Sequence, residues 1–252
     1  MVSFLLVMAL ALLAVWTPWH VRAFAAFKAQ RESGAGRRAF FRRWVGSSLV
    51  LFGGGTLAAL ALLGRLPDLV TPPTEIVLPG KIATQAGSLA WPTWVAASLL
   101  AGMVAITAIA GAARDRRHGR SQNRRLPSIF GDVEYLLPRD GGERLWAIVL
   151  AMNAGITEEA AFRLLLPLLI TLASGDAGLG IAGAALLFGL SHLYLGWRGV
   201  TATALSGVAL SLIYAAADSL LIPIAVHAAV DGLGLLVLPI LAGRRPVSGR
   251  AP

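Results

Sequence analysis

Apolar runs long enough to cross a bilayer recur along the whole chain, and this pattern restricts the fold more than any other feature. We expect seven such spans, at residues 2–19, 44–64, 91–113, 145–174, 178–195, 199–217 and 220–242. A membrane helix needs about 20 consecutive, mostly apolar residues. With 56% hydrophobic and 14% charged residues, the chain of 252 residues is too apolar for a soluble domain. The sequence therefore predicts an all-α, polytopic transmembrane helical bundle.

Basic residues divide the chain and predict its orientation. We expect three membrane helices over 1–113, a cytoplasmic basic loop over 114–143, a helical core over 144–242 and a cytoplasmic tail over 243–252. With the N-terminus outside, 19 of the 22 Lys and Arg residues lie on the cytoplasmic side, which is the asymmetry that orients membrane proteins. We therefore expect a multi-pass protein of a prokaryotic plasma membrane. Its net charge of +9 then comes from basic loops that lie against anionic lipid head groups. No basic stripe or aromatic-basic motif indicates nucleic-acid binding.

The ends and breaks of these runs carry further predictions. No Lys or Arg precedes the first run, which favours a retained helix over a cleaved signal peptide. The run at 145–174 is longer than one span, so it is tilted or broken. Gly155 and Pro167 are the candidate break points, and a break would raise the span count to eight. A short interfacial segment is expected around 129–137.

Two adjacent acids and an arginine interrupt the fourth run. Glu159 and Arg163 are four residues apart on a helix, in a favourable order for an ion pair. Glu158 lies about 100° around the helix from Glu159 and can point elsewhere. Because charged groups are costly in hydrocarbon, a membrane helix that keeps them usually uses them. We expect Arg163 to hold Glu159 while Glu158 acts as a base; the alternative is a charge cluster that only ties helices together.

Two histidines follow in later runs. His192 lies near the end of the fifth run. Phe188 is one helical turn before it, where its ring either forms a wall of a site or takes part in ordinary packing. His227 and Asp231 are four residues apart and share one helix face. Asp231 could hold the His227 imidazole in one tautomer, or both side chains could bind a ligand. A lone membrane histidine often only bonds neighbouring helices, so the combination of clusters indicates function.

These residues are the parts needed to activate water, with or without a metal. We favour the metal-free version, in which no cofactor is needed. Glu158, His192 and His227 are the alternative set of three zinc ligands, although the HExxH signature is absent. The chain has no cysteine, which excludes thiol catalysis and thiolate metal sites. Serine chemistry is disfavoured because no GxSxG elbow is present.

The remaining histidines and two of the acids are expected to be unrelated to a site. We interpret His20 and His118 as surface residues of basic loops. Asp176 and Asp218 lie at helix ends and are most simply solvated.

The three clusters, in this order, resemble the CPBP family of intramembrane proteases, also called the CAAX-protease and bacteriocin-processing or Abi family. The family pattern is EExxxR, then FxxxH, then HxxxN or HxxxD. The corresponding residues here are Glu158, Glu159 and Arg163, then Phe188 and His192, then His227 and Asp231. The resemblance covers about residues 143–242, whereas the first 113 residues resemble only generic membrane helices.

The resemblance implies a membrane endopeptidase with roles for each motif. Glu158 is then the general base and His192 its partner in activating water. His227 and Asp231 line the oxyanion region. An ionised Asp cannot donate a hydrogen bond to an oxyanion, so Asp231 is either protonated or orients His227 as the donor.

We therefore expect an intramembrane endopeptidase that acts on a membrane-embedded or lipidated peptide or protein in the lipid bilayer. The alternatives are a non-catalytic immunity or partner-binding protein and an ion-coupled transporter, for which no internal repeat is found. The seven-span arrangement puts His192 near the cytoplasmic side, His227 nearer the outside and Glu158 between them. A shared site requires tilted helices or shifted boundaries.

Overall fold

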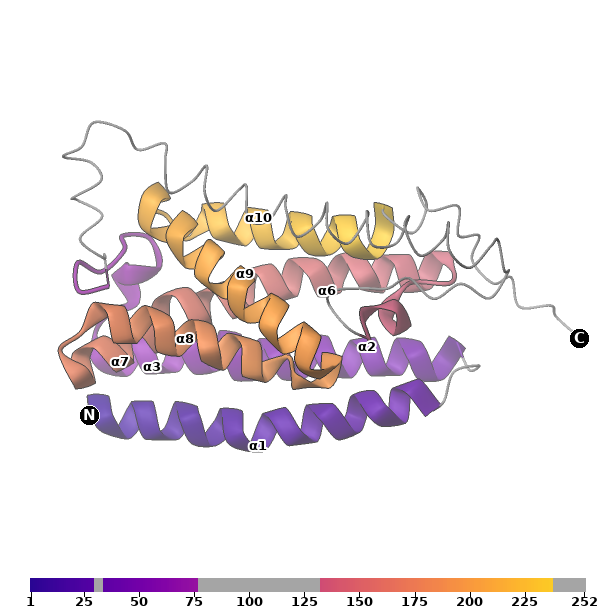
Figure 1. The fold of residues 1–252 in the computed structure, drawn as a ribbon, viewed down its shortest axis with the longest axis horizontal. Helices are drawn as coiled ribbons and strands as arrows, with labels where there is room; N and C mark the ends of the chain where they lie inside the picture. The colour runs from indigo at the N-terminus through magenta and orange to yellow at the C-terminus, as the bar shows by residue number, and fades with distance from the viewer. Residues whose placement is uncertain (30–33, 77–131, 238–252) are drawn as a thin grey trace, which may run out of the picture.

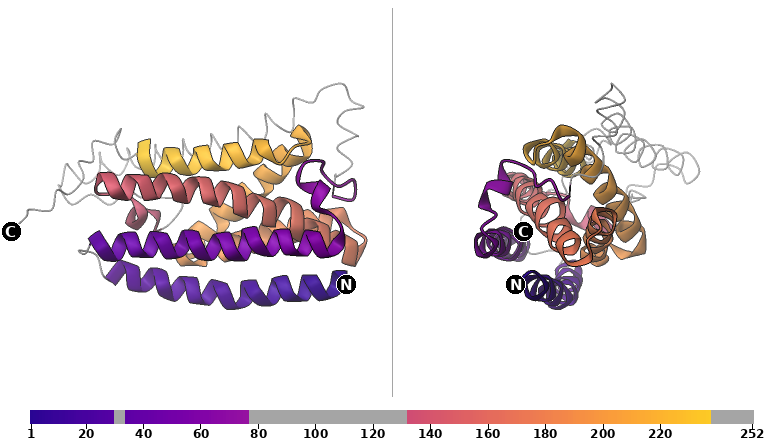
Figure 2. Two further views of the ribbon diagram at one scale, coloured as in Figure 1. Left: turned by 180° about the vertical axis from the view of Figure 1, so that it is seen from behind. Right: turned by 90° about the vertical axis from the view of Figure 1, so that its left-hand side faces the viewer.

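The computed structural model describes residues 1–29, 34–76 and 132–237, and the regular structure within these ranges is helical. Figure 1 shows the helices as a bundle in which α10 and α1 lie on opposite sides of α6, and Figure 2 shows the same order from the end. The prediction of an all-α bundle is confirmed. The predicted span at 91–113, His118 and the basic loop up to residue 131 lie outside the described residues.

Two N-terminal helices run side by side. Helix α1 spans Val2–Ala29. Helix α2 (Gly34–Ser48) continues through a π-helical segment, η1 (Leu49–Gly54), into α3 (Gly55–Leu63). Both helices are longer than the predicted runs at 2–19 and 44–64, because most of the basic stretch between those runs, residues 20–43, is helical. The Lys and Arg side chains of this stretch can bury their aliphatic stems and keep their charges in water.

Arg37 shows why this basic stretch is not a loop. Its side chain is 2% exposed, and its Nε lies 2.9 Å from Glu143 Oε1. The other guanidinium nitrogens donate to the carbonyls of Tyr135 (3.0 Å) and Leu137 (3.1 Å). Glu143 Oε2 accepts from the backbone N–H of Arg139 at 2.9 Å. These bonds clamp α2 to the segment that leads into α6, and they give a buried ion pair the additional partners that it needs.

That segment contains η3, a 3₁₀ turn at Asp132–Leu136, inside the expected interfacial region. Helix α6 (Gly141–Glu159) begins after Asp140, whose carboxylate accepts from the Glu143 N–H at 2.8 Å. A side-chain oxygen at this position satisfies one of the free N–H groups of a helix start.

The predicted break points in the fourth run are wrong. Helices α6 and α7 (Leu166–Ser174) form one continuous helix with a π-helical segment, η4 (Ala160–Leu165), between them. Pro167 lies directly after this segment, in the first turn of α7. Proline lacks the N–H that would bond the preceding turn, and the wider turn before Pro167 accommodates that loss without a break. Gly155 lies inside α6 and serves helix packing instead.

Three further helices complete the described core. Helix α8 spans Ala177–Ser191, α9 spans Gly196–Ala217, and α10 (Leu221–Gly232) ends in a π-helical segment, η6 (Leu233–Val237). A 3₁₀ turn, η5 (Leu193–Leu195), joins α8 to α9. As predicted, Asp176 and Asp218 are exposed at helix ends, where Asp176 caps α8 and Asp218 ends α9.

Three helices of the described chain are long and apolar enough to cross a membrane: Val2–Ala29, Gly34–Leu63 and Leu193–Ala217. Two shorter apolar helices are Ala177–Ser191 and Leu221–Val237. Large apolar side chains such as Phe4, Val15 and Val50 are exposed on the outer helix faces, where a bilayer would cover them. The described helices are therefore those of a membrane bundle, and the total of seven or eight spans and the N-out orientation stay predictions.

Replacing Arg37 by Met should destabilise the protein by about 3–5 kcal/mol, because Glu143 is left buried without its cation. Thermal unfolding in detergent, followed by tryptophan fluorescence, measures the loss. Arg38→Met is the matched control, since Arg38 is 47% exposed and lies 3.8 Å from Asp140. It should change stability by no more than about 1 kcal/mol. Equal losses of stability in the two variants would contradict a stabilising role of the Arg37–Glu143 ion pair.

Candidate active site

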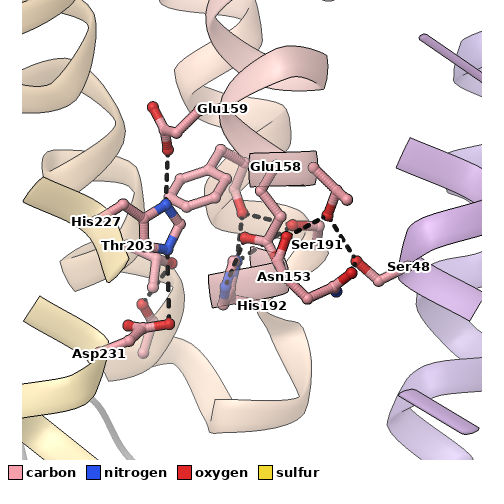
Figure 3. Close-up of polar contacts among 12 residues, drawn as sticks. Ser48, Asn153, Glu158, Glu159, Ser191, His192, Thr203, His227 and Asp231 are labelled. Carbon is pink, nitrogen blue, oxygen red and sulfur yellow. Dashed lines mark hydrogen bonds and ion pairs between the residues drawn. The ribbon is translucent and has the colours of Figure 1, made fainter. Parts of the chain in front are cut away.

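The structure brings all six predicted site residues together. Figure 3 labels Glu158, Glu159, His192, His227 and Asp231 among them. Glu158 and Glu159 are the last two residues of α6, and Arg163 lies in η4. His192 follows the last residue of α8, whereas His227 and Asp231 lie on α10. The different depths expected for His192 and His227 are therefore wrong. Because α8 ends at Ser191 and α10 packs along α6, both imidazoles reach the carboxylates at the end of α6.

Glu159 connects two cationic side chains. It is 0% exposed, and its Oε2 lies 2.9 Å from Arg163 Nε. Its other oxygen, Oε1, accepts a hydrogen bond from His227 Nδ1 at 2.7 Å. The expected contact between Glu159 and Arg163 is present. The partner of His227 Nδ1 is Glu159, however, and not Asp231 as the spacing of four suggested.

The Arg163 guanidinium lies over an aromatic ring. It is 1% exposed, and its central carbon is 4.4 Å from the centroid of Phe188. The same ring contacts the imidazoles of His192 (4.7 Å) and His227 (6.0 Å). The Phe188 ring thus contacts all three groups and forms one wall of the site. A guanidinium over a ring face is attracted by the ring electrons, most strongly where water is excluded.

His192 has one ring nitrogen engaged and the other directed at Glu158. Its Nδ1 lies 2.8 Å from the Phe188 carbonyl oxygen and 3.2 Å from Ser191 Oγ. A carbonyl only accepts, so Nδ1 carries the proton and the neutral ring has a lone pair on Nε2. That nitrogen lies 3.9 Å from Glu158 Oε2, which is longer than a hydrogen bond. The two atoms therefore face each other without direct bonding.

Asp231 is the most exposed of the six side chains. Its Oδ2 is 3.7 Å from His227 Nε2, and its side chain is 36% exposed, compared with 9% for His227 and 0% for Glu159. The contact is longer than a hydrogen bond.

The alternative zinc ligands were Glu158, His192 and His227, and the choice between a zinc site and a metal-free site stays a prediction. Zinc needs three protein ligands within about 2.0–2.2 Å of one point. No group of three His, Cys, Asp or Glu side chains in the described ranges is arranged to hold a metal ion. Both histidines do present Nε2 while Nδ1 is engaged, which is the pattern of metal-ligating histidines. We derive no catalytic step through a metal.

His20 was expected at the surface, and this prediction is wrong. It is 1% exposed, because α1 continues past it to Ala29. Its ring stacks on Trp16 at 4.6 Å and meets Trp44 at 4.5 Å and Tyr194 at 4.7 Å. Trp16, His20 and Phe24 recur every four residues, which places them on one helix face. That aromatic spacing is the signal that could have identified a buried histidine.

Glycine permits the close helix approach on which the site depends. A Cβ at Gly155 would lie 2.9 Å from the Ile224 carbonyl oxygen and 3.1 Å from Ala228 Cβ, both on α10. Gly155 and Glu159 are one turn apart on the same face of α6. The contact at Gly155 therefore fixes the separation at which Glu159 meets His227.

Residues 141–233 match the family model described as Type II CAAX prenyl endopeptidase Rce1-like. Comparison with the curated proteins and with the solved structures finds no match. The matched range contains all six candidate residues and begins at α6, so α1–α3 lie outside it. The predicted resemblance to CPBP intramembrane proteases is confirmed over this range. Together with its apolar helices, the match supports an integral membrane protein that is similar to Rce1-like endopeptidases over residues 141–233.

Gly155→Ala should lower stability by about 1–3 kcal/mol, since the added methyl group must displace backbone atoms of α10. Thermal unfolding in detergent tests the loss. Gly55→Ala is the matched control, because nothing lies within 4 Å of a Cβ at that position. The control should be neutral or slightly stabilising. A Gly155→Ala protein as stable as the control would show that α6 and α10 can move apart freely.

Proposed function

We propose that this protein is an intramembrane endopeptidase that hydrolyses a peptide bond with a water activated by Glu158 and His192. The observation that carries the proposal is the pair of facing atoms, Glu158 Oε2 and His192 Nε2, within the Rce1-like domain. The remaining residues of the site then have supporting roles that follow from their contacts.

Glu158 and His192 can bind one water between them. At a separation of 3.9 Å, a water oxygen set to one side can lie about 2.8 Å from both atoms. It gives one hydrogen to the lone pair of His192 Nε2 and the other to the Glu158 carboxylate. As the water oxygen attacks the carbonyl carbon of the substrate, Glu158 takes its proton.

His227 is the donor that we propose for the oxyanion. Its Nδ1–H is held by Glu159, which Arg163 in turn holds. As an imidazolium, the ring carries a second N–H at Nε2. Asp231 lies 3.7 Å from that nitrogen, too far to occupy it, so the N–H can donate to the carbonyl oxygen when it becomes negative. Asp231 balances the charge of the imidazolium.

The second half of the reaction returns the proton. The tetrahedral intermediate collapses, the C–N bond breaks, and the leaving nitrogen takes the proton from the Glu158 carboxyl group. The former carbonyl and the water oxygen form the new carboxylic acid, which ionises. Glu158 is again a carboxylate, and no other reactant is consumed.

The substrate that we propose is a membrane-embedded or lipidated peptide or protein. The description of the matching family model names a prenyl endopeptidase, which motivates a lipid-modified substrate here. Leu190, Leu193 and Trp197 flank His192 in sequence and are 37%, 36% and 73% exposed. These apolar side chains offer contacts for an acyl or prenyl chain beside the site.

Glu158→Gln should lower turnover by about 10²–10⁴-fold, because an amide cannot take the proton of water. The measurement is cleavage of a library of membrane peptides, with and without prenyl groups, by the purified protein in lipid. Glu75→Gln is the matched control, since Glu75 pairs with Arg65 at 2.8 Å in the loop after α3. It should cleave as the wild type does.

The same assay with a zinc chelator separates the two mechanisms. Cleavage that survives chelation and is lost in Glu158→Gln supports the glutamate mechanism. Loss on chelation, restored by zinc, would replace it with a metal mechanism. Absence of cleavage by a folded wild-type protein would favour the partner-binding alternative.

A further inference from the structure

Tyr194 lies beside the site but belongs to none of the three motifs. It is the middle residue of η5, two residues after His192, and is 8% exposed. Its ring centroid lies 5.7 Å from that of the His192 imidazole. The turn between α8 and α9 therefore places a phenol next to the histidine that we propose as the partner of Glu158.

Three aromatic rings from the N-terminal helices hold Tyr194 in place. His20 and Phe24 of α1 contact its ring at centroid distances of 4.7 and 5.0 Å. Trp44 of α2 contacts it at 5.2 Å. All three contacts are edge-to-face, with interplanar angles of 69–87°, which is a favourable arrangement for aromatic pairs. Rings packed on several sides leave the phenol few orientations.

The phenol of Tyr194 lies close enough to two carboxylates of the site to interact with them electrostatically. Its electrostatic partners are Glu158, on α6, and Asp231, on α10. Within the described part of the chain, no hydrogen bond engages this hydroxyl. A phenol is an O–H donor at neutral pH, because its ordinary pKa is about 10. The site thus contains a phenol donor near the two acids.

The proposed reaction lacks such a donor. Oxyanions of acyl transfer are usually stabilised by more than one preorganised hydrogen bond. His227 supplies one N–H, whereas an ionised Asp231 can only accept. The neutral O–H of Tyr194, beside His192, is available as a second donor.

We infer that Tyr194 is a further catalytic residue, whose hydroxyl donates a hydrogen bond to the oxyanion of the tetrahedral intermediate beside His227. This role rests on the proposed endopeptidase function. His20, Phe24 and Trp44 are then positioning residues. The helices outside the family match therefore contribute to the site by orienting Tyr194.

The test compares Tyr194→Phe with Tyr214→Phe on a peptide that the wild type cleaves. Both variants keep the ring and remove only a hydroxyl, and the Tyr214 hydroxyl is buried on α9 without a hydrogen-bond partner among the described residues. Tyr194→Phe should lower kcat about 10²-fold, the loss typical of one oxyanion donor, with KM changed less than about twofold. Tyr214→Phe should leave kcat unchanged.

Thermal unfolding separates a catalytic effect from a structural one. Tyr194→Phe keeps the ring and its contacts, so its unfolding temperature should equal that of the wild type. A Tyr194→Phe protein with the kcat of the wild type would overturn the role of Tyr194 and leave the endopeptidase proposal intact. No cleavage by the wild type would overturn the proposed function and this role with it. A decrease in kcat equal in both variants would also reject a specific role for Tyr194.

Discussion

The buried carboxylate of Glu159 is the group on which the rest of the site depends. A buried charge in an apolar bundle is tolerated only if an oppositely charged or hydrogen-bonding group pairs with it. Arg163 pairs with it from one turn later on the same helix, and His227 reaches it from α10. The Glu159 carboxylate thus joins two turns of its own helix through Arg163, and it joins α6 to α10 through His227. It also leaves Glu158, the adjacent acid, directed at a different partner.

Helix packing converts this pairing into a site. The close approach at Gly155 brings α10 against α6, and a similar approach at Gly189 sets α8 against α9, where a Cβ would lie 2.8 Å from the Val200 carbonyl oxygen. Small residues at such crossings let backbones pack closely in membranes. The π-helical segment η4 begins directly after Glu159 and contains Arg163. Such irregular turns inside helices often occur at functional sites.

The N-terminal helices contact both the start of α6 and the turn that follows His192. Arg37 clamps α2 to the start of α6, and the aromatic rings of α1 and α2 enclose Tyr194. These helices lie outside the range that matches the family model, which extends from residue 141 to 233. In our proposal, the Rce1-like domain carries the acids and histidines, whereas the added helices orient one of the donors.

The sequence by itself determined the helical membrane class, the family resemblance and the candidate residues, because these depend on local signals. Apolar runs specify membrane helices, and a spacing of four places Glu159 beside Arg163. Pairings between distant residues have no such local signal. That His227 bonds Glu159 rather than Asp231, and that His20 is buried against Tyr194, depend on how α1, α6, α8 and α10 pack. The tertiary structure decided these contacts, since side chains from different helices meet only where backbones approach closely enough.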